Sequence, residues 1–421
     1  MKTIPLIGFF SPWAVFIFSW VVQIALYLMN IAEFMPTGAD AWSAIYNLVL
    51  ISAGAFLPAS LIGYLLARSW LALGSFKEQI DTLRGKSKIL RLSKSRTRLA
   101  ALTLMFLIVV ITLSNWRSYG PLPAITLLTR GDSQYTYLNY GRLMYITFSA
   151  AMLLALLSLF ERSRLWIAFM ISLATGTFLV YVSRGFLIQA ILQYVLLWIF
   201  IRRPKLSLRT ILLTFLVLIV IVLIMGWIGS IRTGTNHFIN AMQIRQEWRI
   251  WPSGVLWIIG YISFPLANMV ALLNSFSEHT GGVLNLTASV PPLFWGVLGL
   301  EDTADLLSSI IGTYFPNPLN TVATYNGWIF IDFGIWGMLI FNFILGLIGS
   351  FLYTFARATR SLLACIVCAI FVSCLVLGVF ANLWLNATIL TQFALAFLLS
   401  GFLKSRMVDM KHKVTKAREY V

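Results

Sequence analysis

The chain has little charge, almost no histidine and few cysteines. Of its 421 residues, 11% are charged, three are histidine and three are cysteine, whereas charged residues make up about a quarter of an ordinary soluble domain. This composition excludes an ordinary soluble protein. Cys365, Cys368 and Cys374 lie within one apolar segment, where nothing would stabilise a thiolate, and we interpret them as packing residues.

The motifs of several large enzyme classes are also missing from the sequence. It contains no Gly-rich phosphate-binding loop, no dinucleotide fingerprint, no paired-histidine zinc motif and no G-x-S-x-G elbow. His412 falls in the basic C-terminal tail, which leaves His237 and His279. Any chemistry must therefore run on arginine, carboxylates, an outer histidine, and amide or hydroxyl side chains.

Long apolar segments are abundant instead. Hydrophobic residues make up 59% of the chain, and runs of roughly 20 apolar residues are typical of transmembrane helices. We predict an all-α, polytopic membrane helix bundle of about 10–12 transmembrane helices. No small-residue cleavage site follows the first run, so we expect that run to be retained. The ten clearest spans are expected near 8–31, 43–66, 99–115, 143–160, 165–182, 186–201, 210–230, 328–354, 361–380 and 387–403.

The basic residues divide unevenly between alternate connections. All ten lysines and most arginines fall in one set, above all in the connection 67–98 and the tail from Lys404. By the positive-inside rule this set is cytoplasmic, so both termini are expected there and the loops 116–142 and 231–327 on the outer side. The net charge of +17 then reflects topology and attraction to anionic lipid headgroups. No folded basic domain is present to bind nucleic acid.

This topology divides the chain into four parts, with the loop 231–327 as a large outer domain between two sets of spans. The loop is too apolar and aromatic for disorder, so we expect a structured cap with interfacial helices. The stretch 253–274 is apolar enough to enter the bilayer; a spanning helix there would require a second crossing near 283–311, where Glu301, Asp302 and Asp305 make it costly. The four parts are a bundle 1–230, the loop 231–327, spans 328–404 and a tail 405–421.

Arginine alone carries the basic charge of the outer side. A guanidinium binds phosphate or carboxylate through two parallel hydrogen bonds, whereas lysine acts as a point charge. An all-arginine set therefore suits a diphosphate near the membrane surface. Arg117 and Arg142 flank spans and are interpreted as interfacial anchors. The seven outer basic residues are Arg117, Arg130, Arg142, Arg184, Arg232, Arg245 and Arg249.

Arg184 lies in a very tight turn between two apolar segments. Gly185 permits a positive φ and Ser183 can cap the following helix, so we expect the turn to fix the guanidinium at the mouth of the bundle. A helix-end arginine that extends to the interface is the alternative, and the same holds for Arg232 at the end of the seventh span.

Arg245 and Arg249 are separated by four residues. This spacing predicts that both lie on one helix face, with Glu247 turned away from it. A plain interfacial amphipathic helix would have the same pattern.

Four segments resemble one known family. The stretches Asn317–Tyr325 and Ile331–Gly337, with Ser183-Arg184-Gly185 and Tyr261–Asn268, look like the signature of Wzy-type O-antigen polymerases. That family also has paired outer loops with an Arg-x10-Gly spacing. Here the matching pairs are Arg130 with Gly141 and Arg249 with Gly260.

The resemblance implies a bacterial inner-membrane glycosyltransferase of the C type with a large periplasmic loop domain. Such enzymes move a growing glycan from one polyprenyl-diphosphate carrier onto a sugar hydroxyl of another, and they require no nucleotide sugar, metal or other cofactor. The implied partners are polyprenyl-diphosphate-linked oligosaccharides, membrane lipid and a polysaccharide chain-length regulator. An O-antigen ligase, a lipid-linked oligosaccharide flippase and a structural membrane protein remain as alternatives.

Roles follow for individual residues if the resemblance holds. Arginines would stabilise the departing diphosphate, and a base would take the proton of the acceptor hydroxyl. His237 is the first candidate base because its ordinary pKa is near neutral, and Glu247 is the second, with an ion pair to a neighbouring arginine as the other interpretation. Asp332 would position sugar or pair with an arginine at a helix end. The expected substrate-binding residues are Arg130, Arg184, Arg232, Arg245, Arg249, Asn320, Tyr325 and Asp332.

Overall fold

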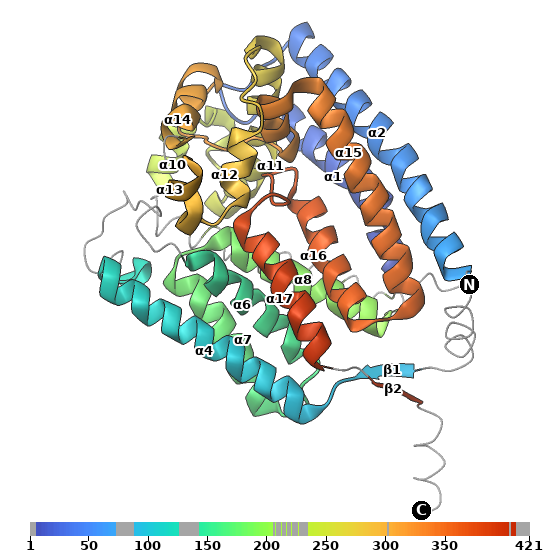
Figure 1. Ribbon diagram of the computed structural model, residues 1–421. Helices are drawn as coiled ribbons and strands as arrows, with labels where there is room; N and C mark the ends of the chain where they lie inside the picture. Colours follow the sequence, from blue (N-terminus) through green and yellow to red (C-terminus); the bar gives the residue numbers. More distant parts are fainter. Residues whose placement is uncertain are drawn as a thin grey trace, which may run out of the picture.

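The computed structural model describes residues 6–72, 88–125, 143–204, 235–300, 303–403 and 406–409, with isolated positions between 207 and 226. Apart from one pair of short strands, the regular structure in these ranges is helical (Figure 1), which confirms the all-α class. The main helices are α1 (Pro12–Leu28), α2 (Ala39–Ala72), α4 (Lys94–Tyr119), α6 (Met144–Ser158), α7 (Arg164–Val180), α8 (Arg184–Arg202), α11 (Ser253–Ser275), α15 (Tyr325–Thr359), α16 (Leu362–Leu377) and α17 (Ala387–Leu403).

These helices match the expected spans closely. A helix is present at each of the nine expected spans within the described ranges, and the tenth, 210–230, lies mostly outside them. By length and composition, α2, α4, α8, α11 and α15 are able to cross a membrane, and α1, α6, α7, α16 and α17 are shorter apolar helices. The described chain therefore contains several helices that are long and apolar enough to cross a membrane.

The closest helix pair joins α2 to α15. A Cβ added to Gly63 of α2 would lie 2.1 Å from the carbonyl oxygen of Leu347, and the hydroxyls of Ser60 and Ser350 share a hydrogen bond. Small residues let helix backbones approach in this way, and packing rather than the hydrophobic effect holds helices together in lipid. On the other side of α2, Leu61 and Leu65 are more than half exposed.

The helix α15 is broken at Gly334, where φ is 63° and ψ is −157°. The hydroxyl of Tyr325 donates to Oδ1 of Asn342 at 2.6 Å, although residues 17 apart in a straight helix are separated by about 25 Å. The segment before Gly334 is therefore folded back against the longer part. The expected span 328–354 was wrong in this respect, since its first residues belong to a separate arm.

A chain of buried polar groups holds this arm in place. Nδ2 of Asn342 donates to Oδ1 of Asn326 at 2.8 Å, and Nδ2 of Asn326 donates to the hydroxyl of Ser52 on α2 at 3.0 Å. A polar group left unpaired among apolar helices is costly, so this network fixes how α2 and the two parts of α15 fit together.

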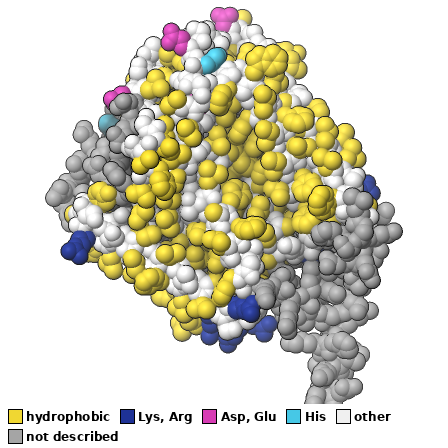
Figure 2. Space-filling view, viewed as in Figure 1, with side chains coloured by type: hydrophobic (Ala, Val, Ile, Leu, Met, Phe, Trp, Pro, Cys, Tyr) yellow, Lys and Arg dark blue, Asp and Glu magenta, His cyan; other side chains and the backbone are white. Residues whose placement is uncertain are grey.

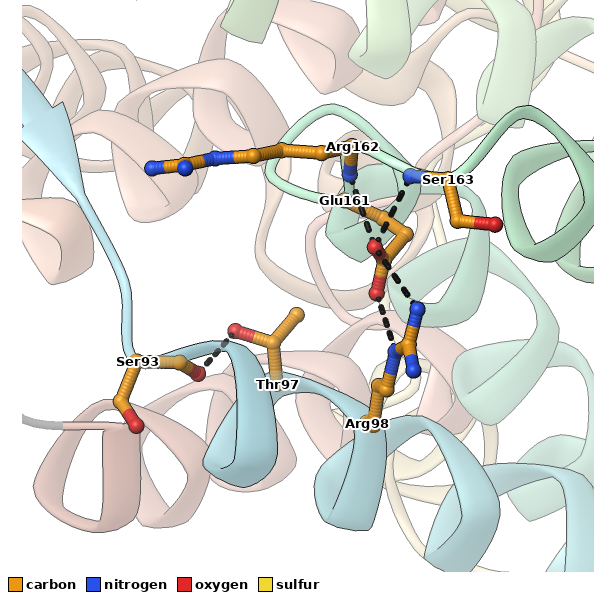
Figure 3. A network of polar contacts seen from close by, with 6 residues as sticks. All are labelled: Ser93, Thr97, Arg98, Glu161, Arg162 and Ser163. Carbon is orange, nitrogen blue, oxygen red and sulfur yellow. Dashed lines mark hydrogen bonds and ion pairs between the residues drawn. The ribbon is translucent and has the colours of Figure 1, made fainter.

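The end of the bundle that carries most of the basic residues is tied together by polar contacts, and we call it the basic end. Strand β1 (Lys88–Arg91) pairs antiparallel with β2 (Arg406–Asp409). Nearby, the buried carboxylate of Glu161 accepts hydrogen bonds from Arg98 and from the backbone amides of Arg162 and Ser163 (Figure 3). These contacts attach the start of α4 to the turn between α6 and α7.

Charge and hydrophobicity are separated along the molecule. On the face shown in Figure 2, Lys and Arg lie mainly toward the lower margin and Asp and Glu near the top, with hydrophobic side chains covering the area between. The 235–300 and 303–324 segments gather at the end opposite the basic end (Figure 1), and we call them the cap.

Candidate functional site

The cap consists of one long helix and several short ones. Between Val283 and Tyr314 the described chain forms separate pieces rather than one helix, so the second crossing that a spanning 253–274 would need is not continuous. Besides α11, the pieces are α10 (Thr235–Ala241), η3 (Gln246–Trp248), α12 (Val283–Ser289), η4 (Pro292–Phe294), α13 (Trp295–Leu298) and α14 (Thr303–Tyr314).

The long cap helix α11 lies against the ends of other helices. Its Tyr261 contacts the start of α8 and the connection between α16 and α17, and its Phe264 packs on Phe34 in the connection between α1 and α2. Asn268 donates from Nδ2 to the carbonyls of Asn320 and Val322 at 2.8 and 2.7 Å. These partners belong to the cap end, which brings the cap and three connections of the bundle into one place.

The turn before α8 aims Arg184 toward α11. Val182 has φ 50°, and the amide of Ser183 donates to the carbonyl of Phe178 at 2.8 Å, closing the end of α7 (Arg164–Val180). The positive φ expected at Gly185 was therefore assigned to the wrong residue. Ser183 also makes no side-chain cap bond to α8, so the closing bond comes from its backbone amide rather than its hydroxyl.

Among the described arginines expected on the outer side, Arg184 alone is buried, with 7% of it exposed. Its Nη2 donates to the hydroxyl of Tyr261 at 2.7 Å, and its guanidinium carbon lies 4.4 Å from the ring centre of Trp257 and 5.4 Å from that of Tyr261. Aromatic faces attract a guanidinium, more strongly when water is excluded. The side chain is thus held in one position by a hydrogen bond and two rings.

An aromatic stack extends this site in both directions. Trp257 stacks on Phe238 of α10 with ring centres 3.8 Å apart and on Tyr261 at 5.5 Å. Tyr261 in turn meets the edge of Phe380, which precedes α17. Trp257 and Tyr261 are four residues apart on α11 and therefore share a helix face. This four-residue spacing of Trp257 and Tyr261 can be recognised in the sequence. Nothing in the sequence indicated that Arg184 packs against the same face of α11.

This arrangement can bind an anion and donate hydrogen bonds to it. A guanidinium has five N–H groups and the Tyr261 hydroxyl, which accepts from Arg184, keeps its own proton to donate. Charge-assisted hydrogen bonds of this kind are about twice as strong as neutral ones.

Arg245 and Arg249 do not share a helix face, contrary to the prediction. Only Gln246–Trp248 is helical there, as a short 3₁₀ turn, and the two arginines flank it. The amide of Arg245 instead pairs with the carbonyl of Ile31, while Nε of Arg249 donates to the carbonyl of Ile244 at 2.9 Å. A short strand-like contact with the α1–α2 connection replaces the helix that the spacing predicted.

The two candidate bases lie on the cap surface. His237 is exposed on α10, next to the buried Phe238 that stacks on Trp257. Glu247 is exposed in the 3₁₀ turn and makes no ion pair with a described residue. His237 therefore directly precedes the residue at one end of the aromatic stack, whereas Glu247 belongs to a different segment of the cap.

Asn320 and Tyr325 take part in buried contacts instead of facing outward. The carbonyl of Asn320 accepts from Asn268, and its Nδ2 is buried without a hydrogen-bond partner. Buried amides are rarely left unpaired, so Asn320 is the expected residue best placed to donate to a further group. Tyr325 belongs to the network of α2 and α15 described above.

Asp332 is a buried carboxylate that holds the cap to the arm of α15. Its two oxygens accept from the Thr280 hydroxyl, from the amides of Leu284 and Asn285 at 3.2 and 2.7 Å, and from Nδ2 of Asn285 at 2.6 Å. The arginine partner considered from the sequence is thus replaced by the first turn of α12. Asn285 also accepts from Nδ2 of Asn382 at 3.0 Å, which ties in the connection that carries Phe380.

Several other residues considered from the sequence lie outside the described residues: Arg130, Arg232, Glu301 and Asp302. Arg117 is described and is exposed at the end of α4. Within the described ranges, no group of three or more His, Cys, Asp or Glu side chains is arranged to hold a metal ion.

Comparison of the chain with models of known protein families, with curated proteins and with solved structures finds no match.

Proposed function

We propose that the chain polymerises polyprenyl-diphosphate-linked oligosaccharide repeat units of O-antigen or a related surface polysaccharide. It would act in the inner membrane of a bacterium, with both termini cytoplasmic and the cap in the periplasm. Membrane lipid and a polysaccharide chain-length regulator would be its partners.

The observation that carries this proposal is the position of Arg184. A buried guanidinium at the cap end of the bundle, held by Tyr261 and Trp257, is where a lipid-linked diphosphate would place its charge, because the lipid chain stays between helices while the glycan extends into the cap. The likeness of Ser183-Arg184-Gly185 and Asn317–Tyr325 to the polymerase signature supports the same assignment.

The proposed reaction exchanges one bond of the sugar for another. The bond between the anomeric carbon of the donor glycan and its phosphate oxygen breaks, and a bond from that carbon to the acceptor hydroxyl forms. Arg184 stabilises the polyprenyl diphosphate as it leaves, and His237 or Glu247 takes the hydroxyl proton. Arg130, Arg232, Arg245 and Arg249 would assist on the phosphates, with Asn320 and Asp332 toward the sugars and no metal ion required.

Substitution of Arg184 is the direct test. Arg184→Ala should abolish polymer ladders on a gel, and Arg184→Lys should recover little, because lysine lacks the planar fork and stacks poorly on Trp257. Arg117→Ala, which removes an exposed arginine at the end of α4, is the matched control and should leave the ladders normal. Ladders of ordinary length from folded Arg184→Ala protein would remove Arg184 from the mechanism.

An assay with the purified protein distinguishes the proposal from its alternatives. Given synthetic polyprenyl-diphosphate repeat units, the protein should form polymer without any other acceptor. The rate of polymer formation in EDTA should equal the rate without EDTA. A ligase would transfer the glycan only when a different acceptor is supplied, and a flippase would move the lipid across a vesicle without changing it.

A further inference from the structure

Gln23 links α1 to two segments that carry residues of the Arg184 site. It is the only amide side chain in α1, and none of its surface is exposed. Nε2 of Gln23 donates to the carbonyl of Ile262 at 2.9 Å and to the carbonyl of Val379 at 2.7 Å. One hydrogen of the NH₂ group thus bonds to α11 and the other to the connection between α16 and α17, and α1 packs against both α11 and α16.

The two carbonyls stand beside aromatic residues of the site. Ile262 directly follows Tyr261, and Val379 directly precedes Phe380. The ring of Tyr261 meets the edge of Phe380, with ring centres 4.9 Å apart and ring planes at 67°. The hydroxyl of Tyr261 accepts a hydrogen bond from Arg184 at 2.7 Å. One NH₂ group therefore fastens both backbone segments whose side chains form this contact.

This part of α11 needs such support because a proline weakens it. Pro265 lies inside the helix and has no N–H, so it cannot donate to the carbonyl of Tyr261, four residues earlier. Gln23 gives this support at a cost to stability, since its Oε1 is buried and has no hydrogen-bond partner among the described residues. An apolar side chain in α1 would avoid that cost. The pair of carbonyls that the NH₂ group holds therefore accounts for the glutamine.

We propose that Gln23 is a positioning residue of the transferase site. By holding the backbones beside Tyr261 and Phe380 at a fixed separation, it fixes the Tyr261 hydroxyl and, through that hydroxyl, the guanidinium of Arg184. Gln23 itself does not touch the substrate. This inference rests on the proposed function, in which Arg184 stabilises the departing diphosphate. A misplacement of about 1 Å in such a group can cost about 100-fold in rate.

Gln23→Met tests the proposal, because methionine has nearly the same length and no N–H to donate. In the polymerisation assay with synthetic repeat units, kcat should fall about tenfold, while KM should change less than about twofold, since the lost effect acts mainly in the transition state. Gln392→Met is the matched control: Gln392 is equally buried and exchanges two hydrogen bonds, of 3.0 and 2.6 Å, with Gln193 between α8 and α17. This control should lower the melting temperature in detergent and leave kcat unchanged.

A double-mutant cycle separates positioning from a general loss of stability. Tyr261→Phe should lower kcat, and adding Gln23→Met to it should cost little more, because both changes act through the same hydroxyl. Gln23→Leu repeats the measurement if the methionine variant does not fold. Additive losses, or equal kcat values for Gln23→Met and Gln392→Met while Arg184→Ala is inactive, would overturn the role of Gln23. An active Arg184→Ala protein would instead reject the proposed function, and this role with it.

Discussion

Val182 occupies a backbone conformation that β-branched residues rarely adopt, with φ 50°. A left-handed conformation costs an L-residue about 1–2 kcal/mol, and such strain often lies next to functional residues. Here the strained residue closes α7 two positions before Arg184, and the contacts of Arg184 with Tyr261 and Trp257 help to hold the turn. The strained turn at Val182 therefore fixes the position of the Arg184 side chain.

Asp332→Asn should destabilise the protein although it barely changes the size of the side chain. All four groups that approach the carboxylate are donors, so an amide NH₂ would face another donor. The expected cost is about 1–3 kcal/mol, seen as a lower melting temperature in detergent. Asp305→Asn, at an exposed position on α14, should have no effect; equal melting temperatures for the two variants would contradict the structural role of Asp332.

At the residue scale, local patterns predicted candidates but not their partners. Arg184 was identified from its tight turn, and Asp332 from the segment Ile331–Gly337 that resembles the polymerase signature. Their contacts come from distant parts of the chain: Tyr261 in one case, Thr280 and Asn285 in the other. Local spacing contains no information on such pairs, and where it was used directly, for Arg245 and Arg249, it predicted a helix that is not there.

At the scale of elements, the contact between α2 and α15 depends on glycine. Gly63→Ala should destabilise the protein, because its Cβ would lie 2.1 Å from a backbone oxygen of Leu347, and a helix backbone cannot move aside as a flexible side chain can. Overpacking of this kind typically costs about 1–3 kcal/mol. Gly54→Ala lies on the same helix with no atom within 4 Å of its Cβ and should leave stability unchanged or raised. Thermal unfolding in detergent measures both, and an equal response would exclude close packing as the cause.

The link between α4 and the α6–α7 turn should depend on pH. Burial acts to raise the pKa of Glu161, but the hydrogen bond from Arg98, the amides of Ser163 and Arg162 and the charge of Arg98 outweigh it and lower the pKa to about 2 from 4.5. A carboxylate with a lowered folded pKa stabilises the fold above its unfolded pKa and loses that effect as the pH falls through its folded value. The wild type should thus have a higher free energy of unfolding than Glu161→Gln. The difference should be constant above about pH 5 and shrink toward pH 2.

A stability difference between wild type and Glu161→Gln that did not change between pH 6 and 3 would show that the ionised pair in Figure 3 is not what attaches α4 to this turn. Arg164→Gln, three residues along the chain and exposed, gives the comparison for loss of a nearby charge.

Hydrophobic runs predicted the helices well because length and apolarity are local properties of the sequence. The break in α15 was not predicted, since Gly334 stands within a largely apolar run that contains no proline. Its cause is tertiary: the Cβ of any other residue would lie 2.7 Å from Nε2 of His279, and the positive φ favours glycine. An interrupted helix of this kind is indicated only by contacts that the rest of the fold supplies.

At the scale of the whole molecule, the separation of charge predicts sidedness. An impermeant maleimide added to intact spheroplasts should label Glu278→Cys, at an exposed cap position, and should label Arg164→Cys only after permeabilisation. The native Cys365, Cys368 and Cys374 are buried and should stay unlabelled. Labelling of Arg164→Cys in intact spheroplasts, or protection of Glu278→Cys, would reverse the orientation and remove the cap from the periplasm.

The pairing of α2 with α15 also bears on how the chain is made. The ribosome synthesises α2 early and α15 late. The face of α2 that carries glycine and serine therefore enters the membrane long before α15 has been made. Polar groups facing lipid are unfavourable, and a nascent chain must keep this face against a temporary neighbour until α15 displaces it. An unfinished chain therefore differs from a finished one by a surface that membrane proteases and insertion factors can recognise.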